Sequence, residues 1–415
     1  MEKSVFAVIV GAGASGLAVA VFLGRKFKNN AKRKIVILER QNKCGKKLLA
    51  TGGGRCNLSN KSVSPTAYYG DRALIDSVLE RFGAEDTIKF FESLGMLVRE
   101  DEAGRIYPYS GKSATVLECL YSECQRLDIE IETDCAVEDI QPKKSAYRIV
   151  SNKGIWTAQN VILACGTGAT PQTGGTNIGF EWLNCLGIDY EPPLAALTPI
   201  RTVQHYPLKG VRAKGTVKLK ADSKVIAQSE GEIQFTDNGL SGICVFDLAH
   251  YVSEFLSRKT INGVSCHQAV LSVDLFPSYG FSELCGYLNK RKNLVSESDS
   301  LWNGALDTKL GSVLVKSCRL NGKRTADLSP KQIKVLAAAA KDFSFIPEEC
   351  SLQNAQVCSG GATVKAVLPQ TLECRKYKGL YITGELLNVD GICGGFNLQW
   401  AWASAFVAAE SVALI

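Results

Sequence analysis

The sequence predicts an α/β fold: a discontinuous Rossmann-like domain built from both ends of the chain, with a β-barrel-like insert and a helical cap between them. Three observations predict it. Residues 5–10 form an apolar run that ends in a glycine-rich turn, as in a buried parallel strand leading into a helix. Residues 200–248 change to short alternating stretches. Residues 379–415 then return to an apolar strand, a glycine pair and a long apolar helix.

The first glycine-rich turn has the spacing of a dinucleotide-binding loop. Gly11, Gly13 and Gly16 follow the G-x-G-x-x-G pattern, with Ala14 and Ser15 between the last two. Gly11 allows the tight turn, Gly13 lets the backbone approach a pyrophosphate, and Gly16 lets the helix pack closely on the strand. Free N–H groups at the start of that helix favour phosphate charge.

A second apolar strand, Lys34–Leu38, ends in an acidic residue. Glu39 lies 23 residues after Gly16, where a carboxylate can accept hydrogen bonds from both ribose hydroxyls. Arg40 follows it directly. These residues predict a dinucleotide site, and a glycine turn without a nucleotide is the alternative.

Composition excludes several classes of protein. The 415 residues allow two or three domains, 46% hydrophobic and 21% charged residues are ordinary for a globular protein, and no apolar run is long enough for a membrane span. Lys and Arg number 48 against 41 Asp and Glu, and the basic clusters are short and lack interleaved aromatic residues. We therefore expect a small-molecule substrate, with neither a nucleic-acid nor a membrane partner.

Cysteine and histidine usage argues against metal and disulfide chemistry. The 15 cysteines are scattered and include no C-x-x-C pair, and no secretory signal is predicted. Reduced thiols and a cytoplasmic location are therefore expected. The three histidines, His205, His250 and His267, are far apart in sequence, so we expect no metal site and no Ser-His-Asp triad.

Residues 43–60 contain three consecutive glycines, with Gly53 at their centre. Each glycine would cost ~1 kcal/mol relative to alanine inside a helix, which predicts a loop. A backbone without side chains suits close approach to a flat or anionic ligand, and a flexible surface loop is the alternative. The flanking hydrogen-bond donors that we expect to bind this ligand are Lys46, Lys47, Arg55, Cys56 and Asn57.

The stretch GKKLLATGGGRCNLSN resembles the signature of a bacterial family of NAD(P)/FAD-dependent oxidoreductases, also described as aminoacetone-oxidase-family FAD-binding enzymes. The family includes a 3-dehydro-bile-acid Δ4,6-reductase. The C-terminal stretch GLYITGELLNVDGICGGFNLQWAWASAFVAA is similar to the same family. The resemblance implies bound FAD and an FAD-binding domain of the glutathione-reductase type.

The resemblance also implies further contacts with FAD. The backbone near Val137 is expected beside the adenine, although a core valine is an equal alternative. Cys165 and Gly166 end an apolar strand whose following turn is expected to place amides near FAD. At the C-terminus, helix N–H groups are expected to face the pyrimidine edge of the isoalloxazine, and Asp390 the ribityl hydroxyls. The C-terminal residues predicted to bind FAD are Gly384, Glu385, Asp390, Gly395, Phe396, Asn397 and Leu398.

Periodicity and composition divide the remaining chain. Amphipathic spacing predicts helices at Ser282–Arg291, Ala305–Val315 and Pro330–Lys341. Ser329 is the expected N-cap of the last one. The expected domains are an FAD-binding domain at 1–195 and 373–415, a β-rich insert at 196–278 with return strands at 347–372, and a helical cap at 279–346.

These features predict an FAD-dependent oxidoreductase. NAD(P)H is expected as a transient electron donor, because residues 174–179 do not supply a second dinucleotide fingerprint. The favoured activity is reduction of a conjugated C=C bond in a 3-oxo compound such as a 3-dehydro-bile acid. The alternatives are an aminoacetone-type amine oxidase using O₂ and a non-enzymatic flavin-binding protein, whereas the C-terminal motif argues against a dehydrogenase that binds NAD(P) alone. No catalytic acid is identified, and the oligomeric state stays open.

Overall fold

The computed structural model describes residues 2–28, 30 and 32–414, which divide into two compact units. Unit 1 combines residues 1–194 with residues 356–415, and unit 2 comprises residues 195–355. The expected return segment, 347–372, is therefore shared, with residues 356–372 belonging to unit 1. Within the described part of the chain, no helix is long and apolar enough to cross a bilayer.

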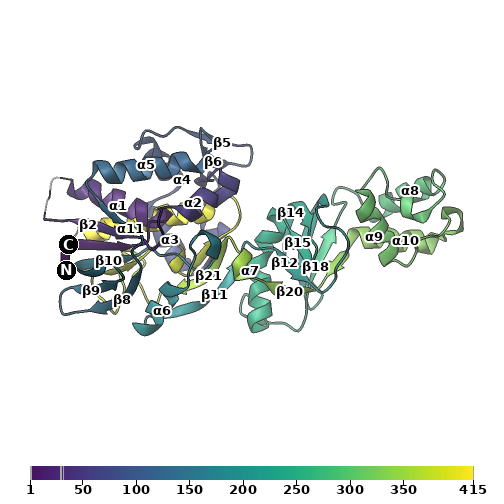
Figure 1. Cartoon of the computed structure of the whole chain (residues 1–415). Helices are drawn as coiled ribbons and strands as arrows, with labels where there is room; N and C mark the ends of the chain where they lie inside the picture. Colours follow the sequence, from purple (N-terminus) through teal and green to yellow (C-terminus); the bar gives the residue numbers. More distant parts are fainter. Residues whose placement is uncertain (1, 29, 31, 415) are drawn as a thin grey trace. The chain divides into compact units, whose positions relative to one another are not determined.

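Unit 1 is built on a seven-stranded sheet in which β10 (Gly154–Leu163) pairs with three other strands (Figure 1). Along one edge it pairs in parallel with β1, while β9 and β22 share its other edge. The sequence predicts two separate strands, at Gly154–Ala158 and at Asn160–Gly166, but residues 154–163 form one strand. The other strands of this sheet are β1 (Glu2–Val10), β2 (Ile35–Leu38), β7 (Glu130–Glu132), β8 (Val137–Pro142), β9 (Tyr147–Ser151) and β22 (Leu380–Ile382).

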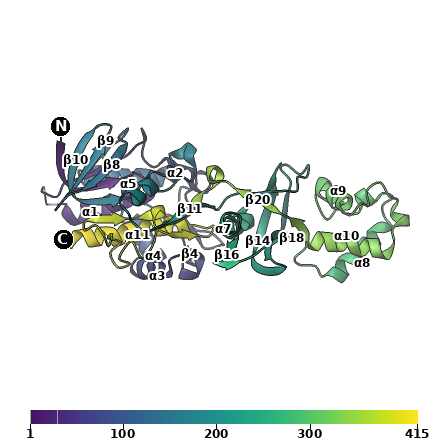
Figure 2. The ribbon, with the colours of Figure 1, turned by 90° about the horizontal axis from the view of Figure 1, so that it is seen from below.

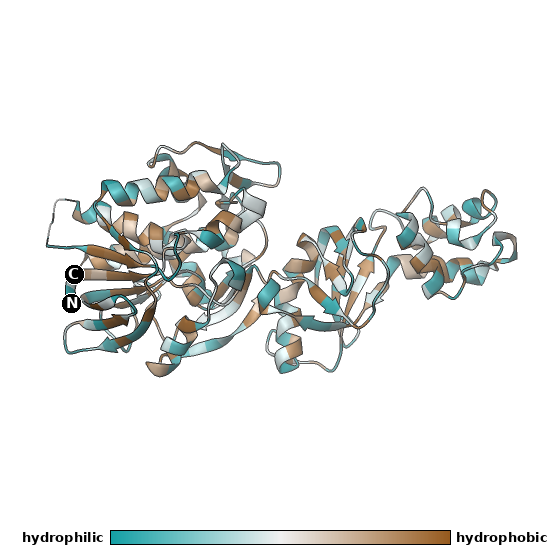
Figure 3. Ribbon diagram, in the orientation of Figure 1, coloured by the Kyte–Doolittle hydropathy of each residue, from teal (hydrophilic) through white to brown (hydrophobic). Residues whose placement is uncertain are grey.

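The apolar strands at the centre of this sheet form the core of unit 1. All four residues of β2 and the last six of β1 are buried, and they lie in the hydrophobic part of the ribbon in Figure 3. Parallel pairing aligns Val10 with both Leu38 and Leu163. The carboxyl ends of these three strands therefore lie together, where an α/β sheet binds its ligand.

Two helices from opposite ends of the chain pack together on unit 1. The helix α1 (Ala14–Phe27) and the helix α11 (Phe396–Ala413) lie side by side in Figures 1 and 2. Most of α11 is buried, including Trp400 and Trp402, as expected for a core helix that is apolar on all sides. The C-terminal segment thus completes the domain that the first residues begin.

Smaller elements surround this core. The glycine-rich loop is preceded by the short helix α2 (Lys46–Ala50), and the strand β3 (Ser59–Asn60) follows it. The other elements of unit 1 are β4 (Tyr68–Gly70), α3 (Arg72–Arg81), α4 (Ala84–Glu92), β5 (Val98–Glu100), β6 (Arg105–Pro108), α5 (Ser113–Arg126), α6 (Ile178–Cys185), β11 (Tyr190–Ala196), β21 (Val357–Ala362) and β23 (Val389–Gly391).

Unit 2 contains a seven-stranded antiparallel sheet in the order β19-β18-β13-β14-β15-β12-β20. Its edge strands are separated in sequence only by Ile346, yet no pairing joins them among the described residues. A β-rich insert is therefore present, but a closed barrel is not confirmed. The strands are β12 (Ile200–Thr202), β13 (Arg212–Ala221), β14 (Lys224–Phe235), β15 (Gly239–Ser241), β18 (Ala269–Asp274), β19 (Phe343–Phe345) and β20 (Pro347–Cys350), and β16 (Thr260–Ile261) and β17 (Val264–Ser265) form a separate hairpin.

One part of the predicted β region is wrong. The alternating pattern was extended to Leu248, but residues 243–258 form the helix α7 (Ile243–Arg258), which packs against β14 and β20. Gly242 ends the β structure with φ +108°, a conformation that favours glycine. Val245, Leu248 and Val252 are buried at helical spacing, a pattern that indicates a helix rather than a further strand.

The three predicted helices after the sheet are present. They are α8 (Phe281–Lys292), α9 (Thr308–Ser317) and α10 (Pro330–Lys341), and together residues 281–341 are called the three-helix segment. The hydroxyl of Ser329 accepts from the Gln332 N–H, which confirms the predicted N-cap before Pro330. Whether this segment covers a substrate pocket stays a prediction.

Candidate functional site

The turn between β1 and α1 provides a cradle that only glycine can form. Gly11 has φ +105°, and a Cβ there would lie 2.6 Å from the carbonyl oxygen of Ala164. A Cβ on Gly16 would lie 1.9 Å from the carbonyl oxygen of Gly11. A Cβ on Gly13, in contrast, would meet nothing within 4 Å. The turn is thus tightly packed behind and open at Gly13, as pyrophosphate binding at a helix N-terminus requires.

Glu39 is oriented toward this turn by two backbone groups. Its Oε2 accepts from the Ala12 N–H at 2.7 Å, and its Oε1 accepts from the Gln41 N–H at 2.7 Å. A carboxylate offers about four lone-pair positions, so acceptor positions remain for ribose hydroxyls. The neighbouring cations point elsewhere: Arg40 donates to the Gly174 carbonyl, and Lys46 donates to the Gln41 side chain.

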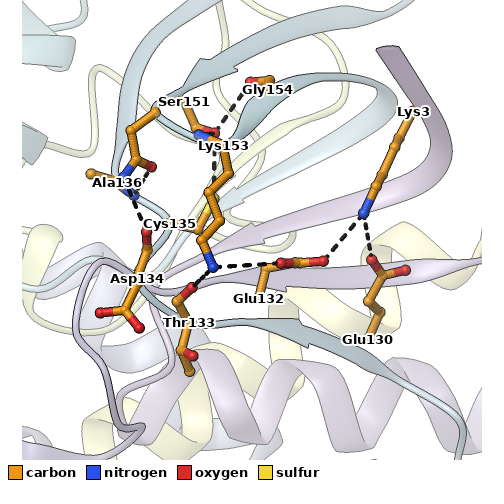
Figure 4. A network of polar contacts seen from close by, with 11 residues as sticks. Lys3, Glu130, Glu132, Thr133, Asp134, Cys135, Ala136, Ser151, Lys153 and Gly154 are labelled. Carbon is orange, nitrogen blue, oxygen red and sulfur yellow. Dashed lines mark hydrogen bonds and ion pairs between the residues drawn. The ribbon is translucent and has the colours of Figure 1, made fainter. Parts of the chain in front are cut away.

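The segment predicted to lie beside the adenine is held by a polar network (Figure 4). Lys153 donates to the Thr133 carbonyl at 2.6 Å, and the Asn152 side chain donates to the Asp134 carbonyl at 3.1 Å. Val137 follows as the first residue of β8, and its side chain is buried in the core of unit 1. The network extends to the ion pairs of Lys3 with Glu130 and Glu132. The adenine contact itself stays a prediction.

The glycine-rich loop presents bare backbone. Gly52, Gly53 and Gly54 have φ between +57° and +85°, and a Cβ on Gly53 or Gly54 would meet nothing within 4 Å. Arg55 is exposed, with its guanidinium 5.5 Å from the centre of the Tyr107 ring. Cys56 is fully buried, and burial raises the pKa of its thiol to about 12. The backbone and Arg55 are therefore available to a ligand, whereas the Cys56 thiol stays protonated.

This loop meets the N-terminus of α11. A Cβ on Gly395 would lie 2.7 Å from Oδ1 of Asn57, a buried acceptor with no hydrogen-bond partner among the described residues. Asn397 is bonded twice to the backbone of Gly391, and the Phe396 carbonyl accepts from the Tyr68 hydroxyl. The N–H groups of the first helical turn, at residues 396–398, have no partner within the helix and can face a ligand.

A third group of predicted residues joins the two ends of the chain. Ser15 donates to Thr383 at 2.9 Å, and a Cβ on Gly384 would lie 3.0 Å from the Ser15 Cβ. Glu385 pairs with Lys47 at 2.7 Å, and a Cβ on Gly166 would lie 3.7 Å from the same carboxylate. Two further predicted residues differ in exposure: Leu398 is partly buried, whereas Asp390 is buried in β23. Burial raises the pKa of the Cys165 thiol to about 12.

Most predicted site residues therefore meet in unit 1, and the chemistry of the site fits FAD. The open cradle suits a pyrophosphate, Glu39 suits a ribose, and the bare loop beside a helix N-terminus suits the isoalloxazine. Sequence reasoning missed the residues that hold these segments together, including Gln399, Ser59 and Thr383, because their role depends on contacts between distant residues. Among the described residues, no cluster of His, Cys, Asp and Glu could hold a metal ion.

Comparisons with known proteins identify the family of the chain. The family model described as HI0933-like protein Rossmann domain matches residues 5–411. A 3-dehydro-bile acid delta(4,6)-reductase from Clostridium scindens is 34% identical over 412 residues, covering 98% of each chain. A ribosomal RNA dihydrouridine synthase from Haemophilus influenzae is 27% identical over 417 residues, also covering 98% of each chain.

Among solved structures, the open conformation of a flavocytochrome c3 fumarate reductase aligns with a TM-score of 0.49 at 13% identity. The alignment covers 99% of this chain and 78% of that chain. From the family match and the full-length relatives, the chain belongs to the HI0933-like family of FAD-dependent oxidoreductases.

Proposed function

We propose that the protein reduces a C=C bond conjugated with a carbonyl group, using NAD(P)H as the electron donor. The observation that carries this proposal is the 34% identity over nearly the whole chain to a protein named 3-dehydro-bile acid delta(4,6)-reductase. Double bonds at positions 4 and 6 are conjugated with a 3-oxo group. The name of the second relative also denotes saturation of a conjugated bond, because the C5=C6 bond of uridine is conjugated with the C4 carbonyl.

The residues of unit 1 account for binding and electrostatics in this proposal. FAD, when bound, supplies hydride transfer. The cradle at Gly13 would hold its pyrophosphate, and Glu39 its ribose. The N–H groups of residues 396–398 would stabilise negative charge at the pyrimidine edge. The pKa values of the Cys56 and Cys165 thiols are raised to about 12, so both thiols stay protonated at neutral pH and neither acts as a nucleophile.

A 3-oxo steroid acid is the first candidate substrate. The stoichiometry balances when NAD(P)H supplies a hydride and solvent supplies a proton, so that the C=C bond gains two hydrogens. NAD(P)H would bind transiently, because residues 174–179 lack the spacing of a second dinucleotide loop.

Uridine in ribosomal RNA is the second candidate substrate, and the charge of the three-helix segment favours it. Residues 281–341 contain 11 Lys or Arg and five Asp or Glu, whereas the rest of the chain contains 37 and 36. Acidic residues are used internally: Asp307 caps α9, Asp299 accepts from the Gly322 N–H, and Asp327 pairs with Arg324. The charged side-chain groups of seven exposed residues have no hydrogen-bond or ion-pair partner among the described residues: Lys290, Lys309, Lys316, Arg319, Lys323, Lys331 and Lys334. Such an excess suits a phosphate backbone.

Anaerobic stopped-flow at the flavin absorbance tests both candidates. NADH or NADPH should bleach the holoenzyme, and a 3-oxo-Δ4,6 steroid acid should then restore its colour. If a uridine-containing ribosomal RNA fragment restores the flavin colour and the steroid does not, uridine in RNA is the substrate. The charge-reversed variant Lys316→Glu/Lys331→Glu/Lys334→Glu should then lose RNA turnover. Bleaching by aminoacetone but by neither nicotinamide would overturn the reductase assignment in favour of an amine oxidase.

A further inference from the structure

The side-chain carbonyl oxygen of Gln399 accepts two hydrogen bonds inside unit 1. Its side chain is completely buried. Its Oε1 accepts from the Ser59 hydroxyl at 2.6 Å and from the Thr87 hydroxyl at 2.7 Å, and its Nε2 donates to the Phe82 carbonyl at 3.0 Å. Ser59 and Thr87 are themselves completely buried. One side chain thus connects α11, β3, α4 and the end of α3.

The segment that Gln399 holds is the continuation of the glycine-rich loop. Two further bonds join this segment to α11: Trp402 Nε1 donates to the Leu58 carbonyl at 3.0 Å, and Asn60 Nδ2 donates to the Gly394 carbonyl at 3.0 Å. The backbones approach closely, since a Cβ on Gly395 would lie 2.5 Å from the Ser59 carbonyl oxygen. The hydrogen bonds of Gln399 also reach α4 and the end of α3, whereas Trp402 contacts α4 only by packing of its ring against Phe91.

We propose that Gln399 is a positioning residue that fixes the glycine-rich loop, residues 51–57, against the first turn of α11. The inference rests on the placement of FAD between these two segments. Both segments must be held in one geometry before FAD binds, because any ordering that binding has to impose reduces affinity. Gln399 lies one turn inside the helix and acts through Ser59 and the helix backbone.

Replacement of Gln399 by methionine tests the proposal. Methionine has similar length but leaves the buried hydroxyls of Ser59 and Thr87 and the Phe82 carbonyl without a partner. Titration of the FAD-free full-length chain should show FAD binding weakened about 10- to 100-fold. In the absence of FAD, trypsin should cleave after exposed Arg55 at least several times faster than in the wild type. Ser411→Ala is the matched control, because Ser411 is buried on the same helix and its hydroxyl donates to the Val407 carbonyl within that helix.

Two more variants separate positioning from general destabilisation. Thr87→Val removes one donor to Gln399 far from the glycine-rich loop in sequence, and should weaken FAD binding with no further loss when combined with Gln399→Met. Gln399→Glu should recover affinity as pH falls, because a protonated carboxyl both accepts and donates, whereas Gln399→Met should not. If Gln399→Met does not fold, the FAD affinity of Thr87→Val and its cleavage after Arg55 test the positioning role instead.

FAD affinity within twofold of the wild type in both variants, with unchanged cleavage after Arg55, would overturn the positioning role. The trypsin measurement needs no FAD. A wild type that binds no FAD would therefore contradict the proposed function and leave the cleavage result to test Gln399 separately.

Discussion

Lys47 and Glu385 form an ion pair between residues 338 positions apart, with Nζ 2.7 Å from Oε2. The other carboxylate oxygen of Glu385 accepts from the Cys358 N–H at 2.9 Å. The lysine lies in α2, and the glutamate lies in the turn after β22. The pair neutralises a carboxylate beside the cradle in which we place the FAD pyrophosphate.

Lys47→Met should therefore weaken FAD binding by about 1–2 kcal/mol, because an uncompensated carboxylate would repel the phosphates. The double variant Lys47→Met/Glu385→Gln should recover most of the loss. Titrations at two salt concentrations check this, since the repulsion is screened at high ionic strength. A double variant no better than Lys47→Met would show that Lys47 acts independently of Glu385.

Gly13→Ala should fold normally and lose FAD, because its methyl group would enter open space where the pyrophosphate is expected. Gly16→Ala should destabilise the protein itself, since its Cβ would lie 1.9 Å from the Gly11 carbonyl oxygen. Two measurements separate loss of FAD binding from loss of stability: the flavin content of the purified protein, and thermal unfolding of the FAD-free protein. Gly286→Ala, on α8 with open space at its Cβ, is the control: it should leave the flavin content unchanged and raise thermal stability slightly, because alanine is favoured over glycine by ~1 kcal/mol inside a helix. FAD retention by Gly13→Ala would contradict the placement of the phosphates.

Glu39→Ala should weaken FAD binding by about 1–3 kcal/mol through lost ribose hydrogen bonds. The same change frees the Ala12 and Gln41 N–H groups that the carboxylate now holds. Glu39→Gln keeps acceptor capacity but loses the charge, so its affinity should be intermediate. Calorimetric titration with FAD and with FMN checks the assignment, because neither variant should alter FMN binding.

The stability of unit 1 should fall on acidification through Glu123. Hydrogen bonds from Arg126 and then Arg25 lower the pKa of Glu123 from 4.5 to about 2. This stabilisation is complete above pH 4.5 and is lost as the pH falls from about 4.5 to 2. Glu123→Gln should lower the free energy of unfolding by about 1–2 kcal/mol at pH 7. This is less than the pKa shift alone would give, because both arginines are partly exposed and solvent screens the interaction. Urea unfolding at pH 7 and pH 3 should show a smaller difference in the variant than in the wild type.

Alkylation should distinguish the cysteines by burial. Cys56 and Cys165 should resist iodoacetamide at pH 8, because burial raises each thiol pKa to about 12. Cys185 is exposed and should react first. Peptide mass spectrometry after timed labelling measures the order, and denaturation should make all three react. Rapid labelling of Cys56 in the folded protein would contradict its buried position.

The sequence predicted those parts of the fold in which local and distant preferences agree. The turn at Gly11 requires glycine by itself, and the three later helices show regular apolar spacing. The helix α7 was not predicted because Gly242 alone separates it from β15, and only this glycine marks the change of conformation. The prediction of two strands in place of β10 was wrong for the opposite reason. The polar residue Asn160 interrupts an apolar run, which suggests a break, but its side chain is buried and donates to the Phe6 carbonyl within one continuous strand.

The candidate site was predicted at the level of segments and not of their connections. The sequence predicts that Arg40, Lys46 and Lys47 contact the ligand, and in the structure they donate to the Gly174 carbonyl, Gln41 and Glu385. These partners lie 5 to 338 residues away. No local pattern specifies such pairings, because they depend on where the sheet brings the ends of its strands together.

The strand order of unit 1 has a consequence for biosynthesis. The C-terminal half of β10 pairs with β22, which the ribosome adds more than 200 residues later. At 5–20 residues per second, the apolar edge at Val161–Leu163 waits roughly 10–40 s for its partner. Unit 2 is contiguous and can fold completely during that interval. Unpaired strand edges of this kind promote association with other unfolded chains, so the nascent protein should depend on chaperone shielding until β22 has emerged.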